Sequence, residues 1–261
     1  MLAAVEEGDV EKMAELMGQD PDFNVNKVQD RVGRTLLHHA SCESDRSAVI
    51  PLLLAHPDID VNMKDSYGMA PFYLACWNGP SSCVRLLLED SRVKVNETDA
   101  DGFTPLFSAV DSARLDNIKW WIASGREMDL GNPRDYQTDA IGMAKKEKKT
   151  EIATLLERFK LNPEETRYQV RVELDWYEKP AAEMFALAVF VSDGLLQINE
   201  TTTPSPAARF FSIARQLPLE LQMVLCHRLV GSAEEIIPGK ESEVAFKNLA
   251  MSLMWSSIFT S

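Results

Sequence analysis

Short apolar segments recur along the first 160 residues, and each follows a polar stretch that contains glycine. The ranges 49–54, 84–88 and 118–122 have the composition of buried helical segments. The stretches before them carry aspartate, glycine, threonine and proline, which are residues that form turns and open helices. This alternation predicts a series of similar helical units in this part of the chain.

The units repeat at a nearly constant distance. Three segments begin with aspartate, carry glycine at the fourth position and end with alanine, and they are 30–40, 65–75 and 99–109. The matched glycines are 35 and 34 residues apart, at Gly33, Gly68 and Gly102. Self-similarity at a fixed period is typical of a solenoid built from stacked repeats.

The pattern resembles the ankyrin repeat, in which a D-x-x-G-x-T-P-L turn opens a helix, a second helix follows, and a Val-Asn tail leads to the next turn. Val61-Asn62 and Val95-Asn96 match that tail. Threonine at the N-cap and proline at the first helical position are favourable helix starts, and here they are Thr35, Thr104, Pro71 and Pro105. The resemblance implies an all-α ankyrin-repeat solenoid of helix–turn–helix pairs with β-turn tips.

Segments at both ends match the repeat more loosely, as terminal repeats do because each has one neighbour. Residues 3–17 lack the opening turn, so we expect the chain to begin inside a repeat. Residues 139–156 keep the helical pattern but lose the turn glycine and the Thr-Pro pair. The resemblance therefore covers about residues 2–160, with about five repeats, and predicts two domains, 1–160 and 161–261.

His38 keeps a histidine that the ankyrin family uses to hydrogen-bond neighbouring backbone, whereas Tyr73 and Phe107 replace it in the next two units. His38 and His39 are adjacent, but no carboxylate and histidine set at ligand spacing accompanies them. We interpret both histidines as structural and expect no metal site.

In ankyrin proteins the turn tips and the inner helices form a concave face that binds other proteins. The resemblance implies these partner-binding residues: Arg34, Tyr67, Met69, Trp77, Asp101, Phe103 and Asp111. Their aromatic and methionine side chains would form an apolar stripe bordered by aspartates, suited to a peptide or helix with apolar anchors and some positive charge. The alternative is that several of them pack against the next repeat or against the C-terminal region.

Residues 161–261 depart from the repeat period and predict a helical C-terminal cap domain. Asn162-Pro163 is a favourable helix start, although the alternation in 168–176 would also suit a strand. We favour the helix. The remaining helices are expected at 180–191, which is apolar on every side, and at 209–216, 217–230 and 241–253.

The string Leu217-Pro-Leu-Glu-Leu221, with Phe246 to Ala250 further on, resembles an F-box or the F-box-like tail of some viral ankyrin proteins. That resemblance implies docking on a Skp-type adaptor of a cullin ubiquitin ligase, with the repeats selecting the substrate. The docking residues would be Leu217, Pro218, Leu221 and Leu225. The alternative is a structural cap that covers the end of the array.

Charge and composition exclude several other functions. The net charge of −13 argues against nucleic acid or an anionic membrane surface as the partner, and no apolar run approaches the roughly 18 residues of a membrane span. The four cysteines form no C-x-x-C pair, and phosphate-loop, zinc-protease and nucleophile-elbow motifs are absent. We expect no enzyme activity and no cofactor, and a cytoplasmic or nuclear location.

Overall fold

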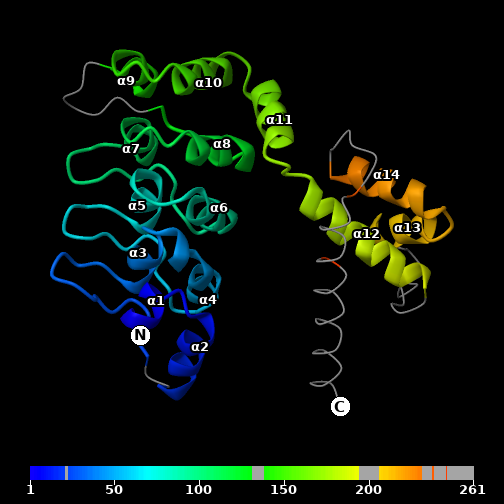
Figure 1. The fold of residues 1–261 in the computed structure, drawn as a ribbon, viewed down its shortest axis with the longest axis horizontal. Coiled ribbons are helices and arrows are strands. Elements are labelled where there is room, and N and C mark those ends of the chain that lie inside the picture. The colour runs from blue at the N-terminus through cyan, green and yellow to red at the C-terminus, as the bar shows by residue number, and fades with distance from the viewer. Residues whose placement is uncertain (21–22, 131–137, 194–205, 231–236, 238–244, 246–261) are drawn as a thin grey trace. The chain divides into compact units, whose positions relative to one another are not determined.

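The computed structural model describes residues 1–20, 23–130, 138–193, 206–230, 237 and 245 (Figure 1). The chain forms two compact units, Met1–Val170 and Arg171–Ser261. Every regular element among the described residues is a helix, which confirms the all-α prediction.

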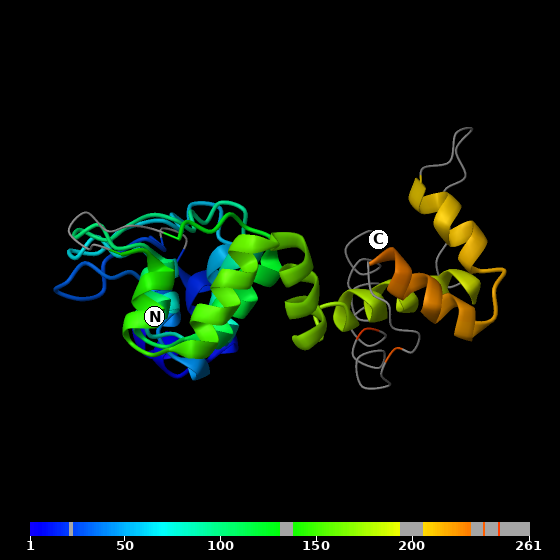
Figure 2. The same ribbon diagram turned by 90° about the horizontal axis from the view of Figure 1, so that it is seen from above.

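The first unit consists of short helices stacked in two columns. The helices are α1 Leu2–Glu6, α2 Val10–Gln19, α3 Leu36–Ala40, the 3₁₀ helix η1 Ser44–Val49, α4 Ile50–Leu54, α5 Pro71–Trp77, α6 Ser81–Glu89, α7 Pro105–Asp111, α8 Leu115–Ser124, α9 Ala140–Lys146, α10 Thr150–Leu161 and α11 Pro163–Glu173. One column holds α3, α5, α7 and α9, and the other holds α4, α6, α8 and α10 (Figure 1). The turns that precede α3, α5 and α7 extend to one side, as Figure 2 also shows.

Each turn is closed by its aspartate and its glycine. In the second repeat, Oδ1 of Asp65 accepts hydrogen bonds from the main-chain N–H groups of Tyr67 (2.9 Å) and Met69 (3.0 Å). Gly68 has φ +75°, a left-handed conformation that glycine adopts without strain. The next turn hydrogen-bonds to this one through the N–H of Ala100 and the carbonyl of Tyr67 (2.9 Å). The turns therefore form a continuous hydrogen-bonded edge along the stack.

The asparagine of each Val-Asn tail joins its repeat to the following one. The side chain of Asn62 donates to the carbonyl of Arg92 (2.9 Å) and accepts from the N–H of Lys94 (2.8 Å). Asn26 binds Asp58 and Asp60 in the same way. Because the amide supplies one donor and one acceptor, it replaces a pair of main-chain partners and fixes the register between repeats.

The predicted helix starts are confirmed. Thr104 accepts a hydrogen bond from the N–H of Phe107 (3.2 Å), and Pro71 and Pro105 occupy first helical positions. The small alanines at the end of the repeated segment, Ala40, Ala75 and Ala109, are fully buried. Their small size lets the helices of a repeat approach closely.

His38 links two repeats as a neutral ring. Its Nδ1 accepts from the N–H of Thr35 (3.1 Å), so the ring proton is on Nε2, which lies 3.1 Å from the carbonyl oxygen of Met69. His38 is fully buried, and this burial lowers its pKa, although the hydrogen bond to Met69 and the charge of Asp65 oppose the shift. The structural role predicted for His38 agrees with this geometry.

Acidification should therefore destabilise the first unit. Since the pKa of His38 is lower in the folded than in the unfolded chain, the unfolded chain binds more protons, and stability falls as the pH drops below the ordinary value of 6.5. His39 contributes in the same direction, because burial also lowers its pKa. Urea unfolding at pH 7.5 and 5.5 measures this difference. His38→Gln should cost about 1–3 kcal/mol at pH 7.5 and show a smaller loss on acidification, and an equal loss would contradict the assignment.

The first compact unit extends ten residues past the boundary expected at residue 160. Helix α11 begins at Pro163, where Asn162 accepts from the N–H of Glu165 (3.4 Å), and Thr166 and Val170 are buried. Arg167 donates from Nε to the carbonyl of Ile122 (3.3 Å). The first turns of α11 thus pack on the repeats. The strand alternative for 168–176 is wrong, because residues up to Glu173 are helical.

The described part of the second unit consists of α12 Glu178–Ser192, α13 Pro206–Ala214 and α14 Leu219–Leu229. These three helices confirm the helices expected near 180–191, 209–216 and 217–230. Its core is formed largely by small side chains and comprises Ala181, Ala182, Phe185, Ala186, Ala188, Ala214, Cys226, Ile237 and Ala245. The helix expected at 241–253 lies outside the described residues except for Ala245. Among the described residues, none of the helices has the length and apolar character needed to span a membrane.

Candidate functional site

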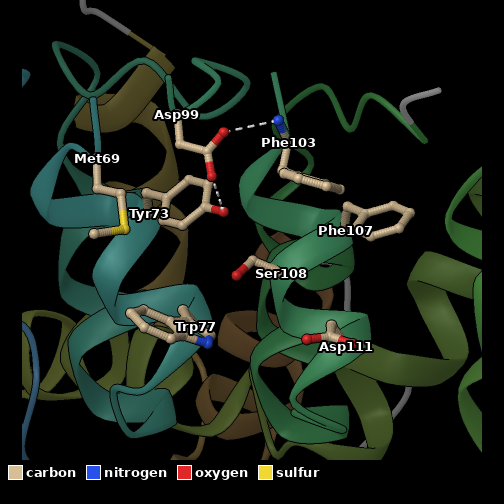
Figure 3. Close-up of a pocket in the computed structure, with 8 residues that line it drawn as sticks. All are labelled: Met69, Tyr73, Trp77, Asp99, Phe103, Phe107, Ser108 and Asp111. Carbon is tan, nitrogen blue, oxygen red and sulfur yellow. Dashed lines mark hydrogen bonds between the residues drawn. The ribbon is translucent and has the colours of Figure 1, made fainter. Parts of the chain in front are cut away.

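A pocket of about 220 Å³ lies between α5 and α7 in the first unit, and the turn before α7 closes one end (Figure 3). Its lining is mainly aromatic and acidic and consists of Met69, Tyr73, Trp77, Asp99, Phe103, Phe107, Ser108 and Asp111. Two consecutive repeats supply these residues. The pocket therefore exists only because the repeats are stacked.

Asp99 connects the turn to the pocket wall. Its Oδ1 accepts from the N–H groups of Asp101 (3.0 Å) and Phe103 (2.9 Å), which close the turn. Its Oδ2 accepts a 2.7 Å hydrogen bond from the hydroxyl of Tyr73 on α5 (Figure 3). Burial raises the pKa of Tyr73; a hydrogen bond with Ser108 opposes this shift and Asp99 adds to it. Tyr73 is thus held as a protonated donor, and it fixes the second repeat to the third.

Aromatic side chains form the remaining walls. The rings of Phe103 and Phe107 lie 5.2 Å apart between centroids with an interplanar angle of 40°. Phe107 is buried and Phe103 is half-buried, whereas Trp77 at the end of α5 is 42% exposed. Asp111, the last residue of α7, is exposed on the opposite side of the pocket from Trp77 (Figure 3). The pocket thus combines a deep aromatic wall with an accessible indole and a carboxylate.

The structure brings together four of the seven residues predicted to bind a partner, namely Met69, Trp77, Phe103 and Asp111. Met69 is only 7% exposed and packs beside Tyr73 and Leu74 in the core, so for this residue the structure fits the alternative of packing within the array.

The other three predicted residues do not line the pocket. Arg34 forms an ion pair with Asp65 at 3.4 Å between Nε and Oδ2, so it stabilises the adjacent turn. Tyr67 and Asp101 are exposed at turn tips. Their side chains are accessible, and their assignment to a partner interface stays a prediction.

The pocket contains four residues that the sequence prediction missed: Tyr73, Asp99, Phe107 and Ser108. Tyr73 and Phe107 occupy the position at which the first repeat has His38, and the His38 ring contacts the next repeat. That equivalence was the available signal, because a ring at this position is directed toward the neighbouring repeat. Asp99 was assigned to turn closure, which is correct but accounts for only one of its two oxygens.

The residues predicted to dock an adaptor lie in α14 and just before it, and they differ in exposure. Leu221 is 51% exposed and Pro218 at the N-cap is exposed, whereas Leu217 and Leu225 are half-buried. Leu225 packs against the core of the second unit. Leu229 lies two helical turns after Leu221 and is 52% exposed. An apolar side chain is therefore presented at each end of α14.

Within the part of the chain that the structure describes, no group of three or more histidine, cysteine, aspartate or glutamate residues is arranged to hold a metal ion. Cys76, Cys83 and Cys226 are buried and Cys42 is half-buried, and all four are free thiols. Burial raises the pKa of Cys83 to about 12 and that of Cys226 to about 11, so neither is an activated thiolate.

Residues 1–99 match a family model described as ankyrin repeats in three copies. A 52-residue part of the chain, 20% of its length, is 46% identical to Rabankyrin-5 from Homo sapiens. The match covers 4% of that relative, so the chain spans a small fraction of its length. The N-terminal region therefore carries ankyrin repeats, which support a role in protein–protein interaction, and the match indicates no catalytic family. The same turn and helix pair continue beyond the matched residues in α7 and α8.

Proposed function

We propose that this protein is an interaction module that binds a segment of another protein on the face of the repeats containing the α5–α7 pocket. The observation that carries this proposal is the position of Trp77, an indole that is 42% exposed at a concave aromatic site. Tryptophan and tyrosine are enriched among the residues that dominate interface energy, above all at well-packed pockets.

The pocket is too small for most free ligands and suits an anchoring side chain. Its volume of about 220 Å³ lies below the roughly 300–1,000 Å³ of typical small-molecule sites. The exposed Tyr67 and Asp101 at the neighbouring turn tips extend the available surface. A partner peptide or helix with an apolar anchor in the pocket would contact these tips as well.

Affinity purification of the full chain from its native cell tests this proposal. The Trp77→Ala, Phe103→Ala double variant should reduce recovery of the partner at least about tenfold, because removing central anchors costs about 2 kcal/mol or more. Tyr168→Ala is the matched control, since Tyr168 is an exposed aromatic on α11, outside the pocket. Unchanged recovery with the double variant would show that the pocket is not the binding site.

A ubiquitin-ligase substrate adaptor is the second candidate function, and the exposure of Leu221 and Leu229 on α14 favours it. In this alternative α14 docks on a Skp-type adaptor while the repeats select the substrate. The proposal rests on the resemblance of residues 217–230 to an F-box and on accessible leucines at that helix.

Co-purification with a Skp-type protein separates this alternative from a structural cap. Leu221→Asp should abolish recovery of that protein without unfolding the chain, because the side chain is half exposed in the free protein. Ile213→Asp on α13 is the control, with a similar exposure of 58% in the same unit. If Leu221→Asp retains the adaptor as well as the control does, or if the unchanged protein recovers none, the adaptor function is rejected.

A further inference from the structure

We infer that the α5–α7 pocket accepts an arginine side chain of the partner. This inference rests on the proposed function and specifies the chemistry of the group bound at its centre. The pocket joins aromatic walls to two carboxylates, Asp99 and Asp111, and it has room for about one side chain.

The carboxylates differ in their availability. Both oxygens of Asp99 already accept hydrogen bonds, one from two main-chain N–H groups and the other from Tyr73. Its charge therefore makes the electrostatic potential negative at the end of the pocket near the turn, but its oxygens are less available to a new donor. The carboxylate of Asp111 makes no hydrogen bond or ion pair with any residue that the structure describes. Asp111 can thus accept a bidentate donor from outside.

Two cations, Lys149 and Arg114, form hydrogen bonds with residues that line the pocket, but they bind main-chain oxygens. Lys149 donates from Nζ to the main-chain carbonyl of Asp111 (2.6 Å), and Arg114 donates to the carbonyls of Trp77 (3.4 Å) and Asn78 (3.0 Å). Both cations therefore bind main-chain oxygens at the ends of α7 and α5. Among the described residues, neither cation forms an ion pair or a hydrogen bond with the side chain of Asp111.

The shape and chemistry favour arginine over lysine or an aliphatic anchor. A guanidinium is planar, stacks on an aromatic face and binds a carboxylate through two parallel hydrogen bonds, whereas an ammonium is a compact and strongly hydrated charge. Trp77 offers an exposed indole across the pocket from the carboxylate of Asp111 (Figure 3). An aliphatic side chain would leave both carboxylates without a cation. The phenylalanine rings would contact the methylene stem of the arginine.

Titration of the whole 261-residue chain with a minimal probe tests this assignment. The probe is Nα-acetyl-arginine amide, and its neutral isostere is Nα-acetyl-citrulline amide. Nα-acetyl-lysine amide keeps the positive charge but lacks the planar guanidinium, so it shows whether planarity matters. The readout is the indole N–H region of a ¹⁵N-correlation spectrum, in which Trp77 is identified by the signal missing from Trp77→Phe. The arginine probe should shift this signal in a saturable way in the millimolar range, the lysine probe more weakly, and the citrulline probe least.

Asp111→Asn should weaken binding of the arginine probe about threefold to fivefold, as expected for one accessible ion pair. Asp116→Asn is the matched control, since Asp116 is an exposed aspartate on α8 outside the pocket. Equal shifts with arginine and citrulline, or equal affinity in Asp111→Asn and the control, would overturn the assignment.

These outcomes are distinct from failure of the proposed function. Partner recovery that is lost in the Trp77→Ala, Phe103→Ala variant but kept in Asp111→Asn would reject the arginine and leave the interaction module standing. Recovery that is unchanged in all these variants would reject the binding face itself, and with it the inference that rests on it.

Discussion

Replacing Gly68 with alanine should lower the free energy of unfolding of the first unit by about 2–5 kcal/mol. The φ of +75° imposes a strain of about 1–2 kcal/mol on any residue with a Cβ. That Cβ would also lie 2.6 Å from the main-chain nitrogen of Ala100 and 3.0 Å from the carbonyl carbon of Asp99. Because these are backbone atoms, no rotamer change relieves the contact, and overpacking of this kind costs about 1–3 kcal/mol more.

Comparison with Gly33→Ala separates the cost of backbone strain from the cost of the close contact with the next turn. Gly33 has the same turn position and φ +83°, but its nearest atom to an added Cβ is the nitrogen of Ser66 at 3.5 Å, an ordinary distance. This variant should lose only about 1–2 kcal/mol. Urea unfolding of both variants, followed by circular dichroism, measures the difference. Equal losses would mean that the turns of the second and third repeats can separate without cost.

The position of Gly68 also connects stability with the candidate site. The contact that a Cβ would force apart is the one that positions Asp99 beside Tyr73. Hydrogen exchange of residues 99–107 should therefore accelerate in Gly68→Ala more than in Gly33→Ala, because less stable segments open more often.

Trp121→Ala should cost about 3–5 kcal/mol, the range for truncation of a buried aromatic side chain. Trp121 is 0% exposed and packs edge-to-face on Phe72 at 5.1 Å between centroids. Its Nε1 donates to the carbonyl of Glu127 (3.3 Å), so truncation also leaves that acceptor without its donor. The cavity would lie between the second and third repeats, beside Phe72.

Trp120 provides the matched control for this prediction. It is the preceding residue on α8 and half-buried, and Arg85 lies over its ring at 5.4 Å from the centroid. Trp120→Ala should lose about 1 kcal/mol or less, because a partly exposed cation–π contact contributes about that much. Thermal and urea unfolding of the two variants give the comparison. A loss for Trp121→Ala no larger than that for Trp120→Ala would contradict the packing described for α8.

The local signals in the sequence accounted for much of the repeat fold. Aspartate and glycine at fixed offsets identify the turns. The aspartate carboxylate accepts main-chain hydrogen bonds and the glycine adopts a positive φ, and few other residue types can do either. Threonine and proline identify the helix starts for the same reason. The boundary after the repeats was harder to place, since the hydrogen bond that joins α11 to the repeats connects Arg167 to Ile122, 45 residues earlier, and no local pattern reveals it.

The candidate site was only partly predictable. Trp77, Phe103 and Asp111 were found because their offsets in the repeat correspond to the binding face. Tyr73 was missed because its role depends on a hydrogen bond to Asp99, 26 residues later, which no local pattern reveals. The docking residues of α14 were proposed from a short string, and their different exposures follow from packing within the second unit.

By itself, the sequence determined that the first part of this protein is a stack of turn–helix–helix units, because the turn chemistry of aspartate, glycine, threonine and proline is local. Only the tertiary structure decided which side chains face the pocket and which enter the core. Met69 is buried whereas Trp77 is exposed, and Trp121 is buried whereas Trp120 is not. The physical reason is that the burial of each side chain depends on which atoms of the neighbouring repeat lie against it. The periodic pattern of one repeat carries no information about those atoms.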